Sequence, residues 1–352
     1  MTAGGGGYPA NADSEHALFE HVRKEFGIGL VSKSKVHRGE DVGAVVLRGF
    51  AQDGASFAVK LSSRAPERGF LVSSHLAALG MRGIPTPLLA RSGKPWSDFD
   101  GRQVSMTPWV RSRPAGGGMT PDQWRNFGAL LAAVHAVDLP RSLQGELKHE
   151  DYRIPEASQV RALDTWVRGG EADHTQIGGA DREDALSRAL IGDWLAASDS
   201  IAVLLDRAQT LGQLLRSHRP QNVLCHGDSH VDNLLVDADE QVWLVDWDAV
   251  VFAPRERDLK FVLEGPTTTA PARPGHEVSF LNGYGPVDVD PVRLAYFRCA
   301  WALEDLGLFG ADIVGERDRA HQERAHALDL FRGLLSPMGI VELALRSVRE
   351  LG

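Results

Sequence analysis

The first half of the chain shows two hydrophobic periodicities, one typical of helices and one of strands. From Asp13 to about Phe26, apolar residues recur on one helical face. Strand-like runs follow at about 28–37, 43–51 and 56–63. Asp53-Gly54, between the last two runs, is a strong signal for a tight hairpin. This part of the sequence therefore predicts one helix and an antiparallel sheet.

The sheet is expected to be completed by later segments. Pro66 opens a predicted helix that ends near Gly80, with its apolar residues on one side. Short strands are predicted at 88–91 and 103–106. We expect these elements to form a small N-terminal lobe over residues 13–110, with a connection to the rest of the chain at 106–110. Residues 1–12 are glycine-rich and polar and are expected to be a disordered tail.

The remainder of the chain, 111–352, is predicted to be a larger, mainly helical lobe. After a loose loop at 111–118, Thr120-Pro121-Asp122-Gln123 is a capping box that begins a helix ending near Val134. Further helices are predicted at about 155–168, 181–217, 277–283, 290–309, 317–335 and 338–351. A small hairpin at 234–237 and 242–245 interrupts them. The predicted fold class is α+β, with two lobes.

Composition and net charge argue against nucleic acid and membrane as partners. The chain has 352 residues, 43% of them hydrophobic, and a formal charge of −9. An acidic protein without a basic face is a poor partner for nucleic acid, and no apolar run is long enough for a membrane helix. The two cysteines, Cys225 and Cys299, lie in apolar contexts, and the start has no secretory pattern. We therefore expect reduced thiols and a cytoplasmic location.

The candidate catalytic and metal-binding residues are concentrated in Leu224–Asp258. His226-Gly227-Asp228 and Asn233 precede the hairpin, and Asp246 follows its second strand. This spacing matches the catalytic loop and metal-binding aspartate of protein kinases. Asp228 is the candidate base, while Asn233 and Asp246 carry the hard oxygen atoms that Mg²⁺ prefers.

The same stretch carries further polar residues. His226 and His230 are expected to anchor the loop rather than to act in catalysis. Asp248 is left open between assisting the metal ion and bonding to nearby backbone amides.

An upstream lysine supplies the positive charge that the acidic cluster lacks. Lys60 lies inside an apolar strand, in a chain where lysine is scarce, and its ammonium group is a candidate phosphate clamp. Glu67, in the first turn of the next helix, is the candidate partner that orients Lys60, although an acidic residue is favoured there by the helix dipole alone.

The motifs CHGDSHVDNLLV and VWLVDWDAV resemble those of the aminoglycoside phosphotransferase and choline kinase-like family. The resemblance implies a protein-kinase-like fold and transfer of the γ-phosphate of ATP, with Mg²⁺, to a hydroxyl of an aminocyclitol or aminoglycoside antibiotic such as spectinomycin. It implies that Lys60 and Glu67 form an ion pair. It also implies that the backbone around a hinge holds adenine, for which the candidates are Met106, Thr107, Trp109 and Val110. Most relatives have Gly where this chain has Asp232.

A protonated aminocyclitol should be held by carboxylates, for which Glu304, Asp305 and, further along, Asp312 are the candidates. Adjacent residues point in different directions on a helix, so at most one of the first two should face a given ligand group. A solvated acidic helix face is an equally good interpretation of each.

Three alternatives remain open. A kinase of a small metabolite alcohol, such as choline or a sugar, would use the same motifs. A metallophosphoesterase would need additional histidine ligands at suitable spacing, which His276 and His321 do not provide. A nucleotide-binding pseudokinase is disfavoured because all the expected catalytic residues are present. The choice between ATP and GTP and the oligomeric state do not follow from the sequence.

Overall fold

The chain forms two compact units. The computed structural model describes residues 12–36, 44–63, 67–170, 182–218, 221–263, 275–315 and 321–352. The first unit contains the described parts of 1–148, 223–252 and 268–286, and the second contains those of 149–222, 253–267 and 287–352. The expected tail at 1–12 lies outside the described residues, except that the first helix begins at Ala12. The predicted lobe boundary near residue 110 differs from this division and stays a prediction.

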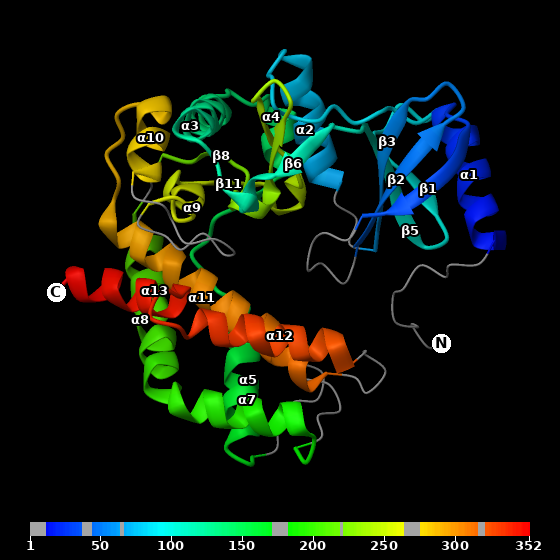
Figure 1. The fold of residues 1–352 in the computed structure, drawn as a ribbon. Coiled ribbons are helices and arrows are strands. Elements are labelled where there is room, and N and C mark those ends of the chain that lie inside the picture. Colours follow the sequence, from blue (N-terminus) through cyan, green and yellow to red (C-terminus); the bar gives the residue numbers. More distant parts are fainter. Residues whose placement is uncertain are drawn as a thin grey trace. The chain divides into compact units, whose positions relative to one another are not determined.

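A five-stranded antiparallel sheet lies in the first unit, in the order β1-β2-β3-β5-β4 (Figure 1). Its strands are β1 (Leu30–Lys35), β2 (Ala44–Ala51), β3 (Ser56–Ser62), β4 (Ser97–Phe99) and β5 (Arg102–Pro108). The predicted hairpin joins β2 to β3, with Gly54 at φ +85°. The sheet and its first three strands confirm the prediction from the sequence.

The two faces of this sheet have different surroundings. One face carries Leu47, Val59 and Met106, which are buried together with Leu18 and Val22 of α1 (Ala12–Phe26). Side chains alternate along strands, so Lys60 lies on the opposite face. The register places Lys60 across from Val46 of β2 and Ser105 of β5. The sheet therefore separates an apolar core from a face that carries a charge.

The strand predicted at 88–91 is wrong. The Leu88 N–H does bond to the Met106 carbonyl at 2.8 Å, but Ala90 instead bonds to Lys94 across a turn. Pro85 and Pro87 precede this segment and cannot donate to a ladder, which explains why a strand does not extend through it.

A second sheet has the order β10-β9-β6. The predicted hairpin is confirmed as β9 (Leu234–Asp237) and β10 (Val242–Leu244). Its third strand, β6 (Ser112–Pro114), pairs with β9 where a loose loop was expected. Pairing with a strand more than a hundred residues away leaves no local signal in a three-residue segment, so this strand was missed.

Helices complete the first unit. They are α2 (Glu67–Ala78), α3 (Pro121–His135), α4 (Arg141–Glu146) and α10 (His276–Tyr284), with the short turns η1 (Ala115–Gly117), η2 (Val231–Asn233) and η3 (Trp247–Ala249). The capping box at Thr120 is confirmed, with both of its reciprocal bonds formed. α3 and α10 lie side by side (Figure 1), and a Cβ at Gly128 would come within 2.1 Å of the Phe280 carbonyl oxygen.

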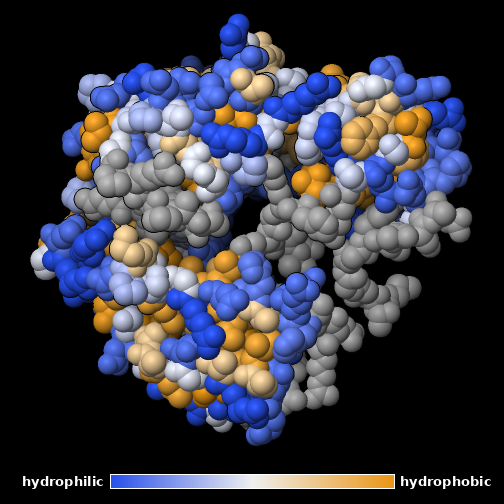
Figure 2. Space-filling model, viewed as in Figure 1, coloured by the Kyte–Doolittle hydropathy of each residue, from blue (hydrophilic) through white to orange (hydrophobic). Residues whose placement is uncertain are grey.

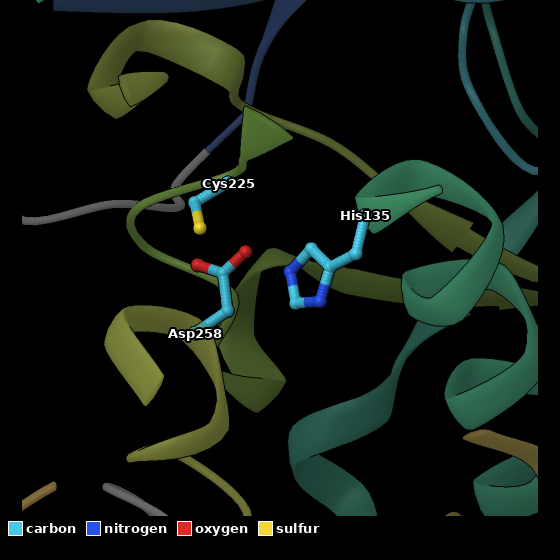
Figure 3. Close-up of side chains that lie close together, drawn as sticks. All are labelled: His135, Cys225 and Asp258. Atoms are coloured by element: carbon cyan, nitrogen blue, oxygen red, sulfur yellow. The ribbon is translucent and has the colours of Figure 1, made fainter. Parts of the chain in front are cut away.

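The strand β8 (Val223–Cys225) leads into the polar cluster. It belongs to a third sheet, in the order β7-β11-β8, with β7 (Lys148–His149) and β11 (Val251–Ala253). Figure 3 shows Cys225 on β8 and His135 projecting from α3. Both cysteines of the chain are buried and neither forms a disulfide, as the sequence predicted. His135 Nδ1 lies 2.6 Å from the Tyr284 hydroxyl of α10, which ties α3 to α10.

The second unit is mainly helical. Its helices are α5 (Ala157–Val167), α7 (Ala185–Ala196), α8 (Ser198–Arg216), α9 (Glu256–Leu259), α11 (Pro291–Val314), α12 (His321–Leu334) and α13 (Ile340–Glu350). The single helix predicted at 181–217 is two helices that meet at Ala197. α11 contributes the largest share of the core, and the buried Arg298 on it bonds to Ser347 Oγ at 2.6 Å.

Polar and apolar residues are interspersed on the visible face of both units (Figure 2). Among the described residues, no helix is both long and apolar enough to span a membrane.

Candidate active site

The loop after β8 is fixed by His226 and Gly227. His226 is fully buried, and its Nε2 donates to the Val245 carbonyl at 3.0 Å while Nδ1 accepts from the Asp228 N–H at 3.3 Å. Gly227 has φ +87°, and a Cβ there would lie 2.2 Å from the Ala249 carbonyl oxygen. Both the backbone conformation and the lack of space require glycine at this position. The anchoring role expected for His226 is confirmed.

Asp228 is held by Asn233. Asn233 Nδ2 donates to Asp228 Oδ2 at 2.9 Å and to the Asp228 carbonyl at 2.8 Å. The amide nitrogen is thereby committed to Asp228, so Asn233 Oδ1 is the atom left to face a cation; this assignment of N and O follows from the bonds themselves. The Asp228 side chain remains 45% exposed, which leaves it accessible to a substrate hydroxyl.

His230 lies between two carboxylates. Its Nε2 is 3.3 Å from Asp228 Oδ2, and its Nδ1 is 3.5 Å from Asp232 Oδ2. Burial alone would lower the pKa of His230, but the two carboxylates outweigh it and raise the pKa to about 10. The Asp232 N–H also lies 3.3 Å from Nδ1, as if Nδ1 were an acceptor. That contact is long, and two anions favour the protonated ring, so we assign His230 as a cation.

Asp246 follows β10 in a strained conformation. Its φ and ψ are 63° and 72°, in the left-handed region that residues other than glycine rarely adopt. The Val245 N–H bonds to the Asn233 carbonyl at 2.9 Å, so Asn233 and Asp246 lie at the same end of the β9–β10 hairpin. Such strain is concentrated at functional sites, and here the Asp246 carboxylate contacts Lys60 of β3.

Lys60, on β3 of the five-stranded sheet, completes the cluster of charged side chains. Its Nζ lies 2.7 Å from Asp246 Oδ1 and 2.7 Å from Asp248 Oδ2. Burial opposes the charge on Lys60, yet the two carboxylates raise its pKa. Burial, and then the charge of Asp246, raise the pKa of Asp248 to about 6, although Lys60 pulls it down. The cluster therefore contains two carboxylates and one cation, and Asp248 contacts Lys60 as closely as Asp246 does.

The expected ion pair between Lys60 and Glu67 is wrong in this structure. Glu67 Oε1 instead accepts a hydrogen bond from Gln103 Nε2 at 2.9 Å. The reason is electrostatic: Asp246 and Asp248 together offer Lys60 more negative charge than Glu67 does, and Glu67 is exposed at the start of α2. Gln103, which the sequence reasoning missed, lies opposite Ser62, one strand over. A contribution of Glu67 to nucleotide binding stays a prediction.

α2 touches the acidic loop directly. A Cβ at Gly69 would lie 2.4 Å from the Trp247 carbonyl oxygen, between Asp246 and Asp248. The helix that begins at Glu67 therefore supports the backbone that carries both carboxylates.

The candidate hinge residues lie at the end of β5 and just beyond it. Met106 is fully buried in the core, whereas Thr107, Trp109 and Val110 are half-buried. The Trp109 N–H bonds to the Ser56 carbonyl at 2.9 Å, and Thr107 lies opposite Ala58. The backbone of Thr107 and Trp109 therefore pairs with β3.

The candidate substrate residues lie on α11, in the second unit. Glu304 is exposed, and Asp305 and Asp312 are half-buried. Asp305 and Asp312 are seven residues apart and share one helix face, while Glu304 points elsewhere. Their role in substrate binding stays a prediction.

The arrangement in the first unit suits phosphoryl transfer. A carboxylate accessible to a hydroxyl, two hard-oxygen side chains at one hairpin end and a lysine beside them are the parts that this chemistry requires. The donor set of Asp246, Asp248 and Asn233 Oδ1 also fits Mg²⁺, which prefers carboxylate and carbonyl oxygen ligands.

Comparisons with known proteins give the same assignment. A model of the phosphotransferase enzyme family matches residues 24–297. A crystal structure of spectinomycin phosphotransferase in complex with ADP and spectinomycin has a TM-score of 0.81 at 25% identity, covering 96% of this chain and 99% of that one. The AMP-bound complex of spectinomycin phosphotransferase has a TM-score of 0.76 at 24% identity, covering 94% and 98%.

A structure with lower sequence identity shares the fold. Ethanolamine kinase from Plasmodium vivax has a TM-score of 0.57 at 12% identity, covering 95% of this chain and 91% of that one. Among curated proteins, no sequence matches significantly. The fold is the protein-kinase-like α+β fold that the sequence predicted.

The family model spans well over half of the chain. This chain belongs to the phosphotransferase enzyme family and is an enzyme that transfers a phosphoryl group to a hydroxyl acceptor.

Proposed function

We propose that the protein transfers the γ-phosphate of ATP, with Mg²⁺, to a hydroxyl of an aminocyclitol or aminoglycoside antibiotic, most specifically spectinomycin or a close relative. The observation that carries the reaction is the pairing of Lys60 with Asp246 beside an accessible, amide-held Asp228. The likeness that supports the acceptor is the spectinomycin phosphotransferase structure, which covers nearly the whole of both chains.

Asp228 acts on the acceptor. With Oδ2 engaged by Asn233 and flanked by His230, Oδ1 is the oxygen that receives the hydrogen bond of the attacking hydroxyl. The bond to Asn233 fixes the carboxylate in one orientation, which reduces the entropic cost of aligning the hydroxyl. The charge of His230 favours the ionised, accepting form of Asp228.

Asp246 and Asn233 hold the metal ion in this proposal, and Asp248 supports them. Bound Mg²⁺ supplies charge neutralisation for the phosphate oxygens of the nucleotide. Lys60 bonds to both aspartates and is placed to turn its ammonium group toward phosphate oxygens instead. Its raised pKa keeps it cationic at neutral pH.

The hinge binds the base. Because Thr107 and Trp109 direct their backbone groups to β3, alternation along the strand points the Pro108 carbonyl to the other side. We assign the Pro108 carbonyl as acceptor and the Val110 N–H as donor for adenine. Proline has no N–H to lose at this position.

The acceptor is cationic in this proposal, and the carboxylates of α11 bind its ammonium groups. Asp305 and Asp312 are the better pair because they share a helix face. Phosphorylation of the antibiotic would confer resistance, and two buried cysteines that form no disulfide are consistent with a cytoplasmic site of action.

A kinase of a small metabolite alcohol is the second candidate, and the likeness to ethanolamine kinase supports the fold that such an enzyme would use. An ATP-consumption screen of the purified protein against spectinomycin, aminoglycosides, choline, ethanolamine and sugars separates the two. We expect consumption that depends on spectinomycin or a related aminocyclitol. Consumption with choline or a sugar alone would favour the second candidate, and no acceptor-dependent signal would contradict both.

A further inference from the structure

Arg48 lies on the same face of the five-stranded sheet as Lys60. β2 alternates between the apolar core, which takes Leu47, and the opposite face, which takes Arg48. The register places Arg48 opposite Ala58, and Ala58 is two residues from Lys60 on β3. The separation of the two rows along the strand is about 7 Å.

The guanidinium of Arg48 reaches the end of the sheet where the proposed hinge begins. Its Cζ lies 4.8 Å from the centroid of the Phe50 ring and 4.9 Å from that of the Trp109 ring. Nη2 is 3.4 Å from Ser56 Oγ, a long and weak bond. Cation–π contacts with two rings hold the planar group in one place.

One donor of this group lacks an acceptor. Arg48 Nε is buried and has no hydrogen-bond partner among the described residues. A buried donor without a partner costs roughly 1–3 kcal/mol, and more when it is charged. A cation fixed by aromatic rings, with an unused donor, is suited to bind an acceptor atom of a ligand.

The row that contains Arg48 lies between Lys60 and the proposed hinge. Arg48 of β2 and Thr107 of β5 both lie opposite Ala58 of β3, whose side chain is a single methyl group. A nucleotide with its phosphates at Lys60 would extend its base along the strands over this row, toward Trp109. The base edge is then within the range of the guanidinium.

We propose that Arg48 is a specificity-determining residue of the nucleotide site and donates hydrogen bonds to acceptor atoms of the purine. This inference rests on the proposed function. Arginine has donors only, and guanine presents two adjacent acceptors, O6 and N7, where adenine presents N7 beside an amino donor. Arg48 therefore favours GTP, relative to the same site without arginine, and gives the enzyme use of GTP as well as ATP.

Calorimetric binding of Mg-ATP and Mg-GTP to the full chain tests this inference. The test variant is Arg48→Met, which keeps an unbranched, largely apolar side chain and removes the guanidinium donors. Arg48→Lys keeps the charge without the planar fork and serves as a second variant if Arg48→Met fails to fold in a thermal melt. The control is Arg23→Met, an exposed arginine of α1, whose helix packs on the other face of the sheet.

We expect Arg48→Met to raise the Kd of Mg-GTP by roughly tenfold and that of Mg-ATP by less, with Arg48→Lys recovering only part of the loss. The Kd of both nucleotides should stay at the wild-type value in Arg23→Met. Unchanged Kd values, or equal changes for the two nucleotides, would overturn the inference.

Lys60→Met separates this outcome from failure of the proposed function. If the wild-type protein binds neither nucleotide, the proposed function is wrong. If the wild type binds, Lys60→Met weakens binding and Arg48→Met does not, only the role of Arg48 is wrong.

Discussion

Lys60 Nζ lies 2.7 Å from Asp246 Oδ1, a contact that joins β3 to the end of the β9–β10 hairpin, 186 residues later. Asp248 Oδ2 lies at the same distance from the ammonium group. Lys60 thus neutralises part of the negative charge of Asp246 and Asp248 that would otherwise attract a metal ion. Lysine and Mg²⁺ compete for the same carboxylates, and this competition has a measurable result.

Replacing Lys60 by Met should strengthen Mg²⁺ binding to the nucleotide-free protein while lowering kcat/KM for ATP. Removing a cation at contact distance from two carboxylates raises their affinity for a divalent ion, by roughly tenfold or more. Calorimetric titration with Mg²⁺ measures the first effect and steady-state kinetics the second. Lys33→Met is a control, since Lys33 pairs with Glu15 on the outer part of the sheet. Weaker Mg²⁺ binding in Lys60→Met would contradict the competition.

Replacing Gly227 by Ala should destabilise the protein by more than about 2 kcal/mol. The substitution combines a left-handed backbone with a Cβ 2.2 Å from the Ala249 carbonyl oxygen. Gly54→Ala is a matched control, because Gly54 also has a positive φ of +85° but no atom lies within 4 Å of the position that a Cβ would take there. Its expected cost is about 1 kcal/mol. Urea unfolding of both variants measures the difference, and equal losses would show that the contact at Gly227 is easily relieved.

The stability of the protein should fall as the pH rises from 7 to 10, through the titration of His230. Its pKa in the fold, about 10, is above its ordinary value of 6.5, so the fold favours the protonated ring. A group of this kind contributes its full stabilisation below pH 6.5 and loses it as the pH approaches 10.

The measurement is the free energy of unfolding of the wild type minus that of His230→Gln, determined at several pH values. This difference should decrease by roughly 1–3 kcal/mol between pH 7 and pH 10. A difference that is constant over this range would mean that His230 is neutral in the fold.

Local signals in the sequence accounted for much of the fold. The capping box at Thr120, the hairpin at Asp53-Gly54 and the helical stripe of α1 each lie within one short segment, and all three are confirmed. The strands β4 and β6 were missed because three-residue strands carry no periodicity of their own. The strand predicted at 88–91 failed because the prolines before it remove backbone donors.

The candidate site shows a similar division. The spacing from Asp228 to Asn233 and the position of Asp246 after a strand could be recognised, because one hairpin positions them. The partners of Lys60 could not be recognised from the sequence, because they depend on which carboxylates the fold brings nearest to the lysine. Arg48 can be placed on the face of Lys60 only through the alternation of β2 and the register of β2 with β3.

The most direct test of the account is a single-turnover measurement of transfer from γ-labelled ATP to spectinomycin, with wild-type protein and with Asp228→Asn. Loss of the carboxylate should slow transfer by at least about 10²-fold, because the asparagine amide is a far weaker base for the hydroxyl proton. ATP binding should be nearly unchanged, since Asp228 faces the acceptor in this account.

We predict labelled spectinomycin with the wild type and almost none with the variant over the same time. Transfer by Asp228→Asn at near the wild-type rate, or release of labelled inorganic phosphate by the wild type with no labelled product from any acceptor, would contradict the central claim.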